Sequence, residues 1–137
     1  MKRCIWLLGL LVCQSLAFAQ EATVPAPLNV SPIGYETVQE AYEALEADPT
    51  ATKSEHEGWT IFNQKTDGTY IIWSFTPEDH PVHPTAVRRE IVKKDGEVFI
   101  SMALLCYSSY FDCDQLIEQF QLINEGLKRK LSDTAGS

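Results

Sequence analysis

The stretch TAVRREIVKKDGEVFISMALL, residues 85–105, decides the fold of this chain. It contains two runs rich in β-branched and apolar residues, 85–94 and 97–105, which favour extended strands. Between them lies Asp95-Gly96, a dipeptide typical of the two-residue turns that join antiparallel strands. Residues 85–105 are therefore predicted to form a β-hairpin.

A second hairpin is predicted just before the first. The runs GWTIFNQ (58–64) and TYIIWSF (69–75) are again rich in aromatic and β-branched residues, and Asp67-Gly68 separates them. The two hairpins together give four antiparallel strands.

One helix is predicted before the strands. Thr37 and Glu40 have the spacing of a capping box, and Asp48-Pro49 ends the helix because the residue before a proline avoids helical geometry. The apolar positions repeat with helical spacing. They are Val38, Ala41, Tyr42 and Leu45. The outer face carries only acidic charges, so it is either an ordinary solvated face or a surface for a basic partner. These charges are Glu36, Glu40, Glu43, Glu46 and Asp48.

A longer helix is predicted after the strands. Asp112 suits the N-cap position and Gln115 the third helical position. The basic run 128–130 suits the negative end of the helix dipole. Six apolar residues are expected to form the buried stripe: Leu116, Ile117, Phe120, Ile123, Leu127 and Leu131.

The predicted order of elements is α-β-β-β-β-α. It indicates a single two-layer α+β domain, residues 35–132, in which two helices pack on a four-stranded antiparallel sheet. The proline-rich segment 20–34 is predicted to be a flexible tether, and residues 133–137 a disordered tail.

Residues 1–19 have the pattern of a secretory signal peptide. A basic pair precedes an apolar run, and the small-x-small sequence Ala17-Phe18-Ala19 predicts cleavage after Ala19. A lipoprotein signal would instead use Cys13, but the bulky Val12 before it fits that pattern poorly. The mature protein is therefore expected to be periplasmic or secreted, with no stable membrane anchor.

The mature chain is strongly acidic. Of the 11 basic residues, Lys2 and Arg3 leave with the signal peptide, so 9 remain against 19 acidic residues, a net charge of −10 with neutral histidines. Such a charge repels nucleic acid and anionic lipid. The expected partners are a protein or a small ligand in the periplasm.

Two cysteines, Cys106 and Cys113, remain after cleavage. An even pair in an exported chain predicts a structural disulfide. Catalytic or metal-binding thiols are the alternative, but the six residues between the cysteines do not match the Cys-x-x-Cys spacing of redox sites.

The segment SFTPEDHPVHP, residues 74–84, carries two of the chain's three histidines. His80 and His83 each precede a proline, so the segment is predicted to adopt polyproline II geometry with both imidazoles facing the same way. The favoured interpretation is a stiff connection between strands, since prolines cannot extend a β-ladder.

Two functional interpretations of this segment stay open. The first is a partner-binding loop in which Trp73 and Phe75, together with His80 and His83, form the contact surface. The second is a metal site formed by the two histidines and Asp79. Zinc needs three or four protein ligands, so Glu78 or His56 would also have to approach.

Common catalytic motifs are missing from the sequence, among them GxSxG, HExxH, the P-loop and GxGxxG. We therefore expect a non-enzymatic interaction module with no catalytic residue and no cofactor. A metal-binding protein using His80 and His83 is the alternative. A hydrolase or oxidoreductase using His56 is less favoured.

The run WSFTPEDHPVHPTAVRRE (73–90), the KDG at 94–96 and the cysteine pair downstream resemble small exported proteins of Gram-negative bacteria that have no assigned activity. The resemblance covers roughly residues 55–125. It implies export and implies nothing about mechanism.

Overall fold

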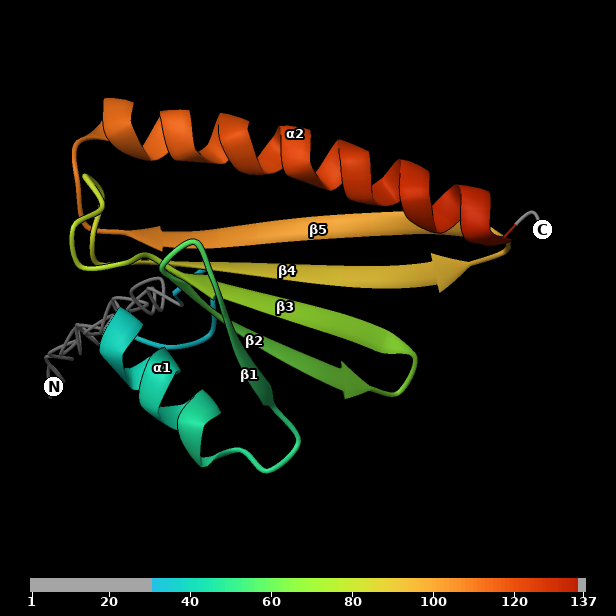
Figure 1. The fold of residues 1–137 in the computed structure, drawn as a ribbon, viewed down its shortest axis with the longest axis horizontal. Helices are drawn as coiled ribbons and strands as arrows, with labels where there is room; N and C mark the ends of the chain where they lie inside the picture. Colours follow the sequence, from blue (N-terminus) through green and yellow to red (C-terminus); the bar gives the residue numbers. More distant parts are fainter. Residues whose placement is uncertain (1–30, 136–137) are drawn as a thin grey trace, which may run out of the picture.

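A computed structural model of the protein describes residues 31–135 (Figure 1). The predicted signal peptide, most of the predicted tether and the last two residues lie outside the described residues. The packed part of the chain starts earlier than residue 35, because Ile33 is buried in the core.

The chain folds in the order α-β-β-β-β-β-α. The elements are α1 (Val38–Ala47), β1 (Thr52–His56), β2 (Trp59–Thr66), β3 (Thr69–Phe75), β4 (Thr85–Lys94), β5 (Glu97–Cys106) and α2 (Tyr110–Ala135). The strands form one antiparallel sheet in the order β1-β2-β3-β4-β5, so each strand pairs with its neighbours in the chain. The α+β class and both predicted hairpins are confirmed, but the sheet has five strands and not four.

The missed strand is β1, the edge strand that pairs with β2. Its sequence TKSEH is polar and every residue is exposed, so it lacks the alternation of a half-buried strand. The overlooked signal is Glu57-Gly58, whose φ angles are 50° and 82°. Asp67-Gly68 and Asp95-Gly96 have nearly the same geometry, with two successive positive φ angles as in type I′ turns.

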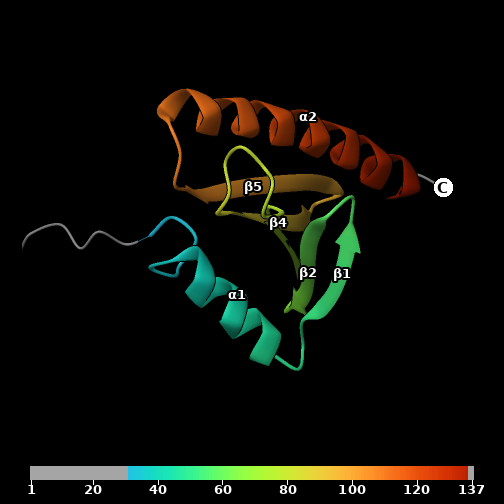
Figure 2. The same cartoon turned by 60° about the vertical axis from the view of Figure 1, so that its left-hand side comes forward.

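The two helices lie on opposite faces of the sheet, as Figures 1 and 2 show. On one face α1 packs against Phe62, Trp73 and Phe75, and on the other α2 packs against Val87. The expected two-layer arrangement is therefore wrong. The reason lies at the start of β4, where the consecutive residues Ala86 and Val87 are both 0% exposed although their side chains point to opposite faces.

The predicted start of the first helix is confirmed, whereas that of the second is wrong. In α1, the amide of Glu40 donates to Thr37 Oγ1 at 3.1 Å. The N-cap of α2 is Ser109 and not Asp112. The Asp112 amide donates to Ser109 Oγ at 3.1 Å, and the Ser109 hydroxyl donates to Asp112 Oδ2 at 2.6 Å. The two residues thus form a reciprocal cap, and α2 continues to Ala135, beyond the predicted end of the domain.

The buried stripe of α2 is confirmed in part. Leu116 and Phe120 are buried, and three further members of the predicted stripe are half-buried: Ile117, Leu127 and Leu131. Ile123 is 51% exposed, so its predicted burial is wrong. Asn124 is the residue that meets the sheet here, with its Nδ2 3.7 Å from Met102 Sδ on β5.

A disulfide joins Cys106 to Cys113, with 6.1 Å between their Cα atoms. It connects the last residue of β5 to the first turn of α2. The prediction of an intramolecular pair is confirmed.

We expect the Cys106→Ser/Cys113→Ser double variant to lose about 2.5 kcal/mol of unfolding free energy, because the open chain regains the entropy of a short loop. Urea denaturation of the oxidised wild type and the variant measures the difference. Reduced wild type should match the variant. Two free thiols in unreduced, denatured wild type would contradict the bridge.

Arg89 is a buried cation between the sheet and α2. It is 6% exposed, and its guanidinium carbon lies 5.1 Å from the centroid of the Phe120 ring. Nη2 donates to Ser74 Oγ at 3.3 Å, while Nε has no hydrogen-bond partner. No ion pair of the described residues includes Arg89. Burial lowers the pKa of this guanidinium, in line with the missing ion-pair partner.

Replacement of Arg89 by Met should leave stability unchanged or raise it by about 1–4 kcal/mol, because buried charges often contribute less than apolar groups of similar volume. Chemical denaturation measures the change. The matched control is Arg88→Met. Arg88 pairs with Glu90 and lies over the Trp73 ring, so this variant should gain nothing. A loss of stability in Arg89→Met would show that the guanidinium stabilises the fold.

Candidate functional site

The connection between β3 and β4 folds as two consecutive turns. The amide of His80 donates to Pro77 O at 3.1 Å, and the amide of His83 donates to His80 O at 2.9 Å. The predicted polyproline II geometry is therefore wrong, because both amides are used in turns that reverse the chain. The two imidazoles consequently have different surroundings.

His80 belongs to the α2 side of the sheet. Its ring lies edge-on to Trp59, with 5.1 Å between centroids, and Trp59 in turn contacts Phe120 of α2. The neighbouring Val82 is buried against Leu116 and Phe120. This half of the connection is a structural cap of the α2-side core, in line with the interpretation as a stiff connection.

On the other side of the connection, the contacts of His83 indicate its tautomer. Its Nδ1 lies 3.1 Å from the carbonyl oxygen of Thr76 and 3.2 Å from Thr76 Oγ1. Since a carbonyl oxygen can only accept, Nδ1 carries the proton of the neutral ring. Nε2 is then a hydrogen-bond acceptor.

His83 lines a cleft of about 630 Å³ at the end of the sheet where β3 ends and β4 begins. We call it the terminal cleft. Fourteen residues line it: Thr37, Val38, Gln39, Tyr42, Gly58, Thr60, Phe75, Thr76, Pro77, Glu78, His83, Pro84, Thr85 and Tyr107. Its volume is in the range of pockets that hold small ligands, and it combines an apolar floor with hydroxyl, amide, imidazole and carboxylate groups.

The cleft is lined by segments far apart in the sequence. The start of α1, the β3–β4 connection and the end of β5 all lie at the left of Figure 1. The Tyr107 hydroxyl, just after β5, donates to the Glu36 carbonyl oxygen just before α1 at 3.1 Å. Gly58 of the β1–β2 turn lies close to Pro77 of the β3–β4 connection; a Cβ on this glycine would be 3.4 Å from Pro77 Cβ. The first contact holds the segment after β5 against the start of α1, and the second brings the β1–β2 turn next to the β3–β4 connection.

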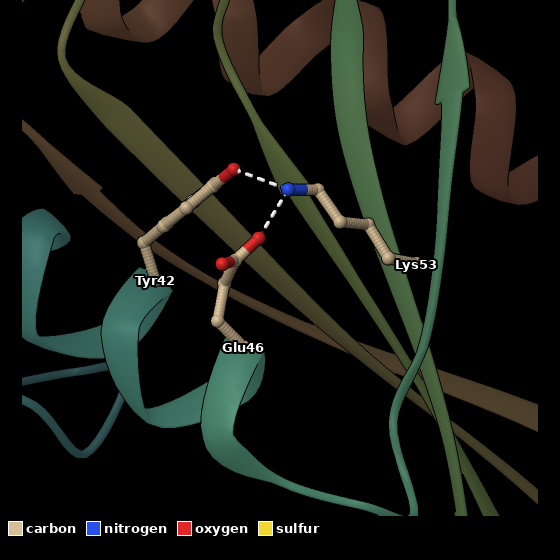
Figure 3. A network of polar contacts seen from close by, with 3 residues as sticks. All are labelled: Tyr42, Glu46 and Lys53. Atoms are coloured by element: carbon tan, nitrogen blue, oxygen red, sulfur yellow. Dashed lines mark hydrogen bonds and ion pairs between the residues drawn. The ribbon is translucent and has the colours of Figure 1, made fainter.

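Tyr42 forms part of the cleft wall and is held from two sides. Its ring lies edge-on to Phe62 and Phe75, with centroid distances of 5.5 and 5.2 Å. Its hydroxyl accepts a hydrogen bond from Lys53 Nζ at 2.7 Å, and Lys53 also pairs with Glu46 (Figure 3). The hydrogen bond from Lys53 lowers the pKa of the Glu46 carboxyl, and the same contact raises the pKa of Lys53. The ion pair thus ties α1 to β1 next to the cleft.

The other residues singled out in the sequence lie apart. Trp73 and Phe75 are only 3% and 4% exposed, so both belong to the α1-side core; Phe75 also contributes to the floor of the terminal cleft. Trp73 lines a second hollow of about 590 Å³ with Arg88. Within residues 31–135, no group of three or more His, Cys, Asp or Glu side chains could hold a metal ion, and Asp79 does not line the cleft beside His83.

Most of the cleft cannot be predicted from the sequence. Thr37 has the signal of a helix cap only, and Gln39, Thr60 and Tyr107 carry no signal at all. These residues come from α1, β2 and the segment after β5, and only the sheet order brings them together.

The chain matches no protein-family model, and neither the curated proteins nor the solved structures include a significant match. In the part of the chain that the structure describes, no helix is both long enough and apolar enough to cross a membrane.

The pKa of Glu46 is depressed in the folded state, so its contribution to stability is present at neutral pH and is lost as the pH falls below about 4. We expect Glu46→Gln to be less stable than wild type at pH 7 and equal to it at pH 2. Urea midpoints across this range measure the effect. The control is Glu118→Gln on α2, and a constant difference between Glu46→Gln and wild type at all pH values would contradict the linkage.

Proposed function

We propose that this protein is an exported, non-enzymatic interaction module that binds its partner in the terminal cleft. The observation that carries the proposal is the cleft itself, in which polar groups from α1, β2, the β3–β4 connection and Tyr107 converge over the aromatic floor formed by Phe75. Such a combination of an apolar floor and a few convergent polar groups is typical of binding sites.

Export is supported by the signal-peptide pattern of residues 1–19 and by the disulfide. Disulfides persist in oxidising compartments and are rare in the cytosol. The Cys106–Cys113 bridge fits a periplasmic or secreted protein.

The non-enzymatic part of the proposal is supported by the hydrogen bonds of the His83 imidazole in the cleft. Thr76 Oγ1 and His83 Nδ1 lie 3.2 Å apart, a distance that would suit a nucleophile and its base. However, Nδ1 holds a proton that is directed to the Thr76 carbonyl, and Thr76 Oγ1 accepts from the Thr85 amide at 3.0 Å. Both groups therefore serve to fix the β3–β4 connection.

Site-specific photo-crosslinking tests the proposal in cells that export the full chain. A benzoylphenylalanine in place of Gln39, on the exposed rim of the cleft, should capture a partner, with adducts read by mass spectrometry. The same probe in place of Lys94, at the far end of β4, is the matched control and should capture none.

A second variant tests whether the captured partner is bound in the cleft. Thr60→Trp fills the cavity from β2, so it should abolish the adducts at position 39 while the melting temperature stays close to that of wild type. Adducts of equal yield at positions 39 and 94, or adducts that survive Thr60→Trp, would refute binding in the terminal cleft.

A further inference from the structure

The residues that line the terminal cleft and their immediate neighbours in the chain carry only acidic charges. Glu78 is the only formally charged residue among the fourteen that line the cleft. Every charged residue directly next to a lining residue in the chain is acidic as well. These neighbours are Glu36, Glu40, Glu43, Glu57 and Asp79, and all five are exposed.

Two positive contributions oppose this field, and both are weak. The N-terminus of α1 carries a partial charge of about +0.5, and part of it is already satisfied, since Thr37 Oγ1 accepts from the Glu40 amide and Glu40 Oε2 accepts from the Glu36 amide at 3.0 Å. Lys53 reaches the Tyr42 hydroxyl, but its charge is paired with Glu46. Half a positive charge and one compensated cation therefore stand against the Glu78 carboxylate of the lining and five acidic neighbours along the chain.

The neutral groups of the cleft suit a cation too. Tyr42, Phe75 and Tyr107 contribute aromatic rings, whose faces attract cations. Tyr107 is 52% exposed, so its ring is accessible to a ligand. The Nε2 atom of His83 is an acceptor in the neutral ring, because Nδ1 holds the proton. A donor-rich cation would find acceptors and aromatic rings in the same cavity.

We infer that the terminal cleft recognises a positively charged side chain, arginine or lysine, in an extended segment of a partner protein. This inference rests on the proposed function, and it adds the chemical class of the ligand. Charge complementarity carries it: a net charge of −10 on the mature chain draws a basic partner towards the protein, and the Glu78 carboxylate in the lining attracts the cation within the cleft.

Titration of the isotope-labelled mature chain with three end-capped tripeptides tests the inference by NMR. The probes are acetyl-Ala-Arg-Ala-amide and its Gln and Glu counterparts. The Arg peptide should shift the amide resonances of Gln39, Thr60 and Tyr107 and bind about ten-fold more tightly than the Gln peptide, as expected for one exposed ion pair and one cation–π contact together. The Glu peptide should bind more weakly than either.

Matched variants assign the effect to individual groups. Glu78→Gln should weaken binding of the Arg peptide about two- to five-fold and leave binding of the Gln peptide unchanged, whereas Glu125→Gln on α2 should change the binding of neither peptide. Tyr107→Leu should weaken binding of the Arg peptide to a similar degree. Tyr110→Leu is the aromatic control, because Tyr110 is 83% exposed and does not line the cleft.

The outcomes separate the two proposals. Equal binding of the Arg and Gln peptides, or no shift with any of the three, overturns the preference for a cation. If position 39 still captures a partner in that case, the cleft remains a binding site for another class of ligand. If the photo-crosslink is missing as well, the proposed function falls with the inference.

Discussion

The start of β4 is the constraint on which the rest of this structure depends. Thr85, Ala86 and Val87 are consecutive and each is 0% exposed, although neighbouring side chains of a strand point to opposite faces. Both faces of the sheet must therefore be covered at the same place. A single helix cannot do this, and the chain places α1 on one face and α2 on the other. The strands between the two helices form a meander, in which each strand pairs with the next one in the chain and no crossover is needed.

The same constraint explains why the β3–β4 connection serves two purposes. Because it leads into the strand that both layers cover, its turns contact both: Val82 and His80 pack towards α2, while Pro77 and His83 face the cleft beside α1. Thr85 holds the connection in place, since its amide donates to Thr76 Oγ1 at 3.0 Å and its hydroxyl donates to the Val82 carbonyl. One side of this segment thus closes the α2-side core, and the other lines the terminal cleft.

Local signals in the sequence were sufficient for the hairpins and for the first helix. The Asp-Gly turns and the Thr37–Glu40 cap each depend on residues a few positions apart, and the structure contains all of them. Some failures are local: the Glu57-Gly58 turn that joins β1 to β2 and the Ser109 cap of α2 depend on residues a few positions apart. Other failures depend on contacts between distant segments, since Ile123 is exposed because the path of α2 over the sheet brings Asn124 to Met102. The terminal cleft is the extreme case. The sequence singles out Phe75, Glu78 and His83, but Gln39, Thr60 and Tyr107 join them only in the folded chain.

The disulfide lies next to the terminal cleft, and it is the kind of bond that persists in the oxidising compartment in which the protein is expected to work. Cys106 ends β5, and the next residue, Tyr107, donates its hydroxyl to the Glu36 carbonyl and forms one wall of the cleft. The bridge to Cys113 restricts the start of the connection to α2 and therefore limits the positions that Tyr107 can take. Oxidation stabilises the fold by reducing the entropy of the unfolded chain, and at the same point it orders Tyr107 of the terminal cleft. In the function that we propose, this preorganisation lowers the entropic cost of binding, so the bridge would contribute to the proposed site as well as to stability.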